Sequence, residues 1–141
     1  MSNVLLLVRR VLLAALFIVF GFIKFQNISF FLNLREIKQV TELVGIGPSP
    51  LWFGYLVATI EVLGGIAILI GFKTRWVAWG LIVYLIIATL VGHPFWAMEG
   101  PVRFSYQFHF YKNLAIIAAY LMLIVSGPGA YSVDAKIGEK V

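Results

Sequence analysis

The stretch LWFGYLVATIEVLGGIAILI, residues Leu51–Ile70, decides the fold of this chain. Glu61 is the one residue in it that carries a charge at neutral pH. About 20 apolar residues at 1.5 Å per residue form a helix roughly 30 Å long, which matches the hydrocarbon core of a bilayer. The stretch therefore predicts a membrane-spanning helix with a carboxyl group near its middle.

The position of Glu61 on this helix indicates a bundle. Gly54, Ala58, Glu61 and Gly65 follow one another at steps of four, three and four residues, so they share one helical face. A carboxylate at the centre of a bilayer costs roughly 2.5–3.5 kcal/mol and usually faces the interior of a bundle, where it has a partner. Small residues beside it let other helices approach closely. We therefore expect Glu61 to be buried between helices.

The composition agrees with a membrane protein. Of the 141 residues, 62% are hydrophobic and 12% charged, against about 45–50% and about 25% in soluble domains. The net charge of +5 comes from scattered bases, which favours contact with anionic lipid over nucleic-acid binding. The chain has no cysteine, which excludes disulfides, thiolate-held iron–sulfur clusters and covalent c-type haem.

Hydropathy along the chain predicts an all-α membrane protein: a bundle of four transmembrane helices with an interfacial amphipathic helix between the first and the second. Residues 93–111 form a long connection in which Phe104, Tyr106, Phe108 and Phe110 alternate with polar residues. This pattern is compatible with a short strand, but it favours an aromatic belt at the membrane interface. One domain, residues 1–141, is expected, with helices at about 8–25, 51–70, 76–92 and 112–126 and the amphipathic helix at about 29–44.

The basic residues favour cytoplasmic termini. Four spans place both termini and the loop at residues 71–75 on one side, and bases are more numerous there than in the long connections. We therefore expect a bacterial-type inner-membrane protein with both termini in the cytoplasm, and Arg9 and Arg10 snorkelling to that interface. The bases counted on the cytoplasmic side are Arg9, Arg10, Lys73, Arg75, Lys136 and Lys140.

Polar side chains from all four predicted helices converge in the outer half of such a bundle. Glu61 either forms a structural ion pair with Lys24 or takes up a proton or binds a ligand. His93 either ends its helix or relays protons, and Asn113 either bridges helices or contacts a ligand. Lys24 and Lys112 either snorkel or bind a ligand. No metal site is expected, because His93 and the second histidine show no metal-binding spacing.

A series of motifs along nearly the whole chain resembles the DoxX family of small four-helix membrane proteins. That resemblance implies a link to membrane redox complexes, since members resemble the small subunit of thiosulfate:quinone oxidoreductase. It also implies that Arg75 is a further polar position of the family pattern. It assigns no reaction to any residue. The motifs are Gly21-Phe22-Ile23-Lys24-Phe25, Gly47-Pro48 with Pro50, Glu61 with Gly64-Gly65, Gly71-Phe72-Lys73-Thr74-Arg75, Gly92-His93 with Phe95-Trp96, Lys112-Asn113, and Gly127-Pro128-Gly129 with Ser132 and Asp134.

Two functional hypotheses follow. In the first, the chain is a subunit of a quinone-linked oxidoreductase. Glu61 and His93 relay protons, the quinone lies against Lys24, Lys112, Asn113 and Trp96, and a partner protein or a bound cofactor supplies electrons. In the second, it is a non-catalytic binder or carrier of a lipid or small amphiphile, or a scaffold for a partner complex. Membrane lipids, a redox partner and a second copy of the chain are the partners considered.

Overall fold

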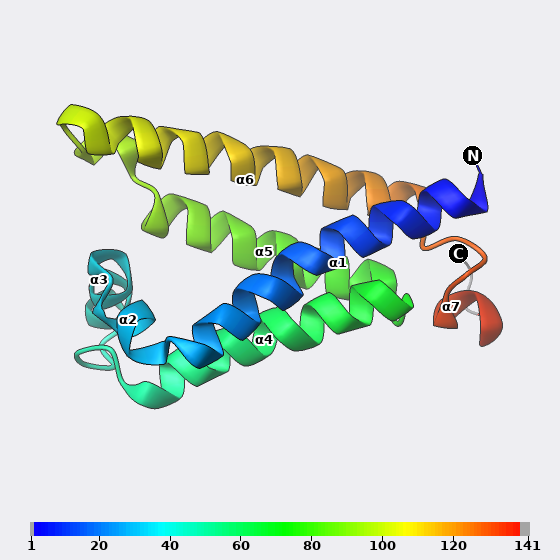
Figure 1. Ribbon diagram of the computed structural model, residues 1–141, viewed down its shortest axis with the longest axis horizontal. Coiled ribbons are helices and arrows are strands. Elements are labelled where there is room, and N and C mark those ends of the chain that lie inside the picture. Colours follow the sequence, from blue (N-terminus) through cyan, green and yellow to red (C-terminus); the bar gives the residue numbers. More distant parts are fainter. Residues whose placement is uncertain (1, 139–141) are drawn as a thin grey trace.

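Figure 1 shows the computed structural model, which describes residues 2–138. Four helices in this part of the chain are long and apolar enough to cross a membrane, which confirms the predicted all-α four-helix architecture. Both ends of the chain and the turn after α4 lie at one end of the molecule (Figure 1), and the long connections lie at the other. The helices are α1 Asn3–Gln26, α4 Leu51–Ile70, α5 Thr74–Gly92 and α6 Gly100–Ser126.

The long helices pack as two pairs, α1 with α4 and α5 with α6. Glycines allow the close approach of α1 and α4. A Cβ atom added at Gly65 would lie 2.7 Å from Ile18 Cγ1, and one at Gly21 would lie 2.8 Å from Val62 Cγ2. The predicted face of α4, including Glu61, is buried. Phe17, Ile68 and Tyr120 belong to the apolar core that joins the two pairs.

The predicted amphipathic helix at 29–44 is two helices, α2 Ile28–Asn33 and α3 Arg35–Leu43. Leu34 between them is extended, with φ −61° and ψ 138°, so the prediction of a single helix was wrong. The break lets Ile28 and Leu32 of α2 pack against Gly54 of α4, while α3 turns towards α5. One straight helix could not make both contacts.

Two further boundaries differ from the prediction. The first helix begins at Asn3 and not near Val8. The last long helix, α6, begins at Gly100 and not at Lys112. The aromatic residues 104–110 are therefore helical, and the alternative of a short strand there was wrong. Pro101 lies in the first turn of α6, where its fixed φ and missing N–H suit a helix start. A 27-residue helix is about 40 Å long, so its first turns exceed the hydrocarbon core.

The expected snorkelling of Arg9 and Arg10 was also wrong, because both side chains turn inward to the carboxyl-terminal segment. Arg10 is fully buried and donates to the carbonyl of Tyr131. Arg9 donates to the carbonyl of Gly127 at 2.7 Å and to the Ser126 hydroxyl. Backbone carbonyls there offer these guanidinium groups fixed acceptors. Lys140, counted with these bases in the topology prediction, lies outside the described residues.

A short helix, α7 Val133–Lys136, carries a carboxylate back to the start of α5. Asp134 Oδ1 accepts from the backbone N–H of Lys73 at 2.7 Å, and Oδ2 accepts from that of Thr74 at 2.9 Å. The first N–H groups of a helix have no partner within the helix. Asp134 therefore caps α5 and holds the carboxyl-terminal segment across this end of the bundle.

Candidate functional site

Glu61 lies near the middle of α4 and is 5% exposed. The small side chains on its face bring α1 against α4, as described above, and α5 passes on the other side. Two residues from these neighbouring helices reach the carboxylate. The carboxyl group predicted from the sequence is therefore enclosed by protein.

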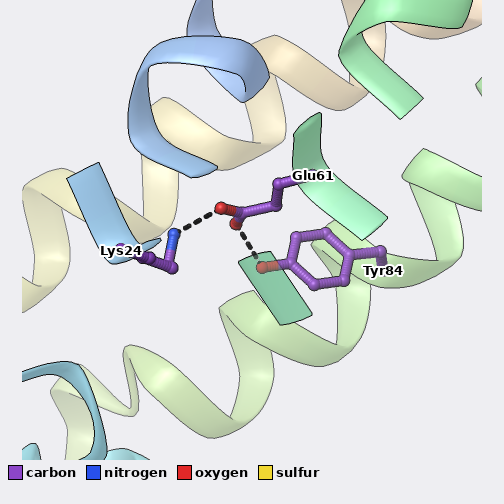
Figure 2. A network of polar contacts seen from close by, with 3 residues as sticks. All are labelled: Lys24, Glu61 and Tyr84. Carbon is purple, nitrogen blue, oxygen red and sulfur yellow. Dashed lines mark hydrogen bonds and ion pairs between the residues drawn. The ribbon is translucent and has the colours of Figure 1, made fainter. Parts of the chain in front are cut away.

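The carboxylate of Glu61 joins three helices (Figure 2). Lys24 Nζ on α1 forms an ion pair with Glu61 Oε2 at 2.6 Å. The hydroxyl of Tyr84 on α5 donates a hydrogen bond to the other oxygen, Oε1. The Lys24 side chain is 20% exposed, and its Nζ lies 5.5 Å from the ring centre of Phe31 on α2. We call Lys24, Glu61 and Tyr84 the polar triad.

A second cation, Lys112, lies on α6. Lys112 is half-buried and lies near enough to Lys24 for their charges to interact. Its Nζ lies 3.4 Å from Nδ1 of His109, one turn earlier on the same helix. No carboxylate pairs with Lys112 within residues 2–138. The ion pair between Lys24 and Glu61 has no net charge, so Lys112 adds one uncompensated positive charge to this region.

His93 lies at the end of α5, beside α6. Its ring stacks on His109, with ring centres 5.1 Å apart, and meets Tyr106 edge to face at 5.9 Å. Lys112, His109 and His93 are therefore neighbouring titratable side chains at this end of α5 and α6. The part of the chain that the structure describes holds no group of three His, Asp or Glu residues that could bind a metal ion.

Asn113 is not part of this group of side chains. Its Nδ2 donates to the Thr89 hydroxyl at 3.0 Å, and both side chains are buried. The Thr89 hydroxyl in turn donates to the carbonyl of Leu85 at 2.5 Å. Asn113 therefore bridges α5 and α6, which is the structural alternative considered for it from the sequence.

Trp96 and Arg75 both lie away from the triad. Trp96 belongs to the short 3₁₀ helix η1, Phe95–Ala97, where its ring packs edge to face against Phe95 and Phe110 and stays largely exposed. Arg75 is at the opposite end of the molecule, near the start of α5, and its Nε donates to the carbonyl of Ile124 at 3.2 Å. It contributes to packing of α5 on α6.

The role of Tyr84 and the contacts of Arg10 and Asp134 were not predicted from the sequence. Tyr84 completes the triad; the signal was a tyrosine inside an apolar helix, because a buried tyrosine hydroxyl usually has a hydrogen-bond partner. Arg10 and Asp134 hold the carboxyl-terminal segment, and no local pattern shows that residues so far apart in the sequence meet.

A family model and several known proteins match this chain. The family model described as DoxX matches residues 5–94. The chain is 33% identical to inner membrane protein YphA of Escherichia coli (strain K12), covering 94% of this chain and 90% of that protein. It is 33% identical to inner membrane protein YqjF of the same organism, covering 99% and 97%. Surfeit locus protein 4 homolog of Schizosaccharomyces pombe is 34% identical, over 60% of this chain and 29% of its own length. No solved structure matches the chain significantly.

Proposed function

This chain belongs to the DoxX family of membrane proteins, and we propose that it is the quinone-binding subunit of a membrane oxidoreductase. Its four apolar helices and its inner-membrane relatives make it a multi-pass membrane protein. The quinone headgroup lies beside the polar triad and Lys112 in this proposal. Both termini are cytoplasmic, which places the site in the outer half of the bundle.

One observation supports this proposal above the others: each of the four long helices contributes a hydrogen-bonding or charged group to one region of an otherwise apolar bundle. Lys24 comes from α1, Glu61 from α4, Tyr84 from α5 and Lys112 from α6. Quinone carbonyls are hydrogen-bond acceptors, and the ammonium groups of Lys24 and Lys112 are donors. The one proton of the Tyr84 hydroxyl is donated to Glu61, so Tyr84 orients the carboxylate. An apolar quinone tail suits the lipid-facing surface around such a site.

Reduction of a quinone to a quinol takes up two electrons and two protons. In this proposal a partner protein supplies the electrons, because the chain lacks the cysteines that hold iron–sulfur clusters. Protons reach the headgroup from outside through His93, His109 and Lys112, which neighbour one another in that order. Glu61 then exchanges a proton with the bound headgroup.

The uncompensated charge of Lys112 favours one alternative. A site with one cation in excess suits an amphiphile with an anionic headgroup, and the chain would then be a non-catalytic lipid or amphiphile binder or carrier. The headgroup would lie between Lys24 and Lys112, and no electron donor would be needed. The same residues carry both functions, so only the bound molecule distinguishes them.

The experiment is extraction and mass spectrometry of the molecules retained by detergent-purified protein. The wild type is compared with Glu61→Gln and Lys112→Gln, and with Arg103→Gln, a matched control that removes a charge from the exposed start of α6. Quinone enriched over its share in the membrane, and lost in the first two variants only, supports the redox subunit. An anionic amphiphile with the same pattern supports the binder. Equal retention by all four proteins refutes both.

A further inference from the structure

A groove of about 380 Å³ opens at the end of the molecule where α2 and α3 meet the start of α4. Its apolar lining residues are Leu32, Pro48 and Leu51. The other lining residues carry hydrogen-bonding or charged groups and are Ser29, Asn33, Lys38 and Ser49. The groove is separate from the polar triad, none of whose residues lines it.

The walls of the groove are held in place before any ligand binds. Thr41 is fully buried, and its hydroxyl accepts a hydrogen bond from the N–H of Ser49 at 3.1 Å. This bond ties the loop before α4 to α3. Ser49 has φ +40°, a conformation that residues other than glycine rarely adopt. Its hydroxyl is buried and has no hydrogen-bond partner within residues 2–138, so it is a donor still to be satisfied.

The charge of the groove is positive. Lys38 is the charged residue that lines it, and no carboxylate pairs with Lys38 in the described part of the chain. The acidic residues of α3, Glu36 and Glu42, do not line the groove. An ammonium group beside hydroxyl and amide donors suits an anion with several acceptor oxygens, such as a phosphate.

The groove lies at the level of lipid headgroups. Leu51, which lines it, is the first residue of a membrane-spanning helix, and α1 ends nearby at Gln26. Large apolar side chains are exposed on the three helices that form it, among them Phe30 of α2, Leu43 of α3 and Trp52 of α4. Such side chains enter the boundary between headgroups and acyl chains. A ligand here has its polar part against Lys38 and its apolar part against the bilayer.

We propose that this groove binds the phosphate headgroup of one anionic phospholipid, with Lys38 and the Ser49 hydroxyl as the two principal contacts. The acyl chains lie along the exposed apolar surface of α4. The lipid joins α2 and α3 to the membrane and so fixes the segment that covers the polar triad, whose Lys24 faces Phe31 of α2.

The test is a titration of delipidated protein in detergent, followed by native mass spectrometry. Phosphatidylglycerol is compared with phosphatidylcholine of the same acyl chains. Lys38→Gln removes the charge, and Ser49→Gly removes the hydroxyl while favouring the positive φ. Arg103→Gln is the control, since it removes one positive charge from a different helix. A charge-assisted hydrogen bond corresponds to roughly a tenfold to hundredfold change in affinity.

We expect one tightly bound phosphatidylglycerol per chain, at least about tenfold weaker binding in Lys38→Gln, weaker binding in Ser49→Gly, and no change in Arg103→Gln. Equal binding of phosphatidylcholine, or unchanged affinity in Lys38→Gln, overturns the proposal. Displacement of the lipid by equimolar glycerol 3-phosphate assigns the groove to a soluble phosphate instead. We expect Glu61→Gln to bind phosphatidylglycerol as tightly as the wild type does, even where it loses the quinone. The lipid proposal and the quinone proposal can therefore be refuted independently.

Discussion

The ion pair between Lys24 and Glu61 offers the sharpest test of what holds this bundle together. The perturbations are Lys24→Met, Glu61→Gln and the two combined. Lys24→Met leaves the carboxylate of Glu61, 6% exposed in its side chain, with the Tyr84 hydroxyl as its remaining partner. Glu61→Gln leaves the ammonium of Lys24, whose side chain is 20% exposed and can turn towards water. The two single variants therefore differ in the charge that each leaves buried.

The magnitudes follow from that difference in burial. Breaking a buried ion pair by removing one partner costs about 3–5 kcal/mol when the other charge stays buried, and Lys24→Met fits that case. Glu61→Gln keeps an acceptor for Tyr84 and loses a charge-assisted hydrogen bond, which costs about 1.5–3 kcal/mol. The double variant leaves no charge within the polar triad. We therefore expect it to be more stable than Lys24→Met alone, although one more native group has been replaced.

The assay is thermal unfolding of the four proteins in one detergent, followed by circular dichroism. In a chain of this size 1 kcal/mol corresponds to roughly 2–4 °C. Lys24→Met should therefore lower the midpoint by about 6–20 °C, and the second substitution should recover part of that loss. Additive losses in the double variant, or a Lys24→Met protein as stable as the wild type, would refute the view that burial of an unpaired carboxylate decides the outcome.

Three further predictions concern stability and use the same unfolding measurement. Tyr84→Phe should cost about 1.5–3 kcal/mol, because the carboxylate loses a hydrogen bond; an unchanged midpoint would show that water replaces the hydroxyl. Gly71→Ala should destabilise strongly, because the added Cβ would clash with Arg10 Nη1 and the residue has φ +69°. Gly80→Ala adds a Cβ with nothing within 4 Å, so it should stabilise its helix by about 0.5–1 kcal/mol. Equal effects of the two substitutions would contradict the packing around Arg10. Asp134→Ala should cost about 0.5–2 kcal/mol through loss of the cap on α5, and protection of the first α5 amides against hydrogen exchange should fall with it.

The transmembrane helices were predictable because their signal is local. The bounds of α4, Leu51–Ile70, match the prediction at both ends, since hydrophobic length and the flanking Pro50 and Gly71 are read directly along the chain. The break at Leu34 and the early start of α6 were not predicted. Amphipathic and aromatic patterns show which side of a segment is apolar. They do not show whether its backbone continues through one residue, which depends on what each half packs against.

The sequence by itself determined that this is a four-helix membrane protein with an acid on the small-residue face of its second span, because apolar length and helical periodicity are properties of each segment alone. Lys24 was one predicted partner of Glu61, and in the structure Lys24 Nζ lies 2.6 Å from Glu61 Oε2. Only the tertiary structure decided that Tyr84 takes the other oxygen, that Asn113 pairs with Thr89, and that Arg10 is buried. These pairings depend on the rotation and depth of one helix relative to another, and side-chain packing between helices sets both.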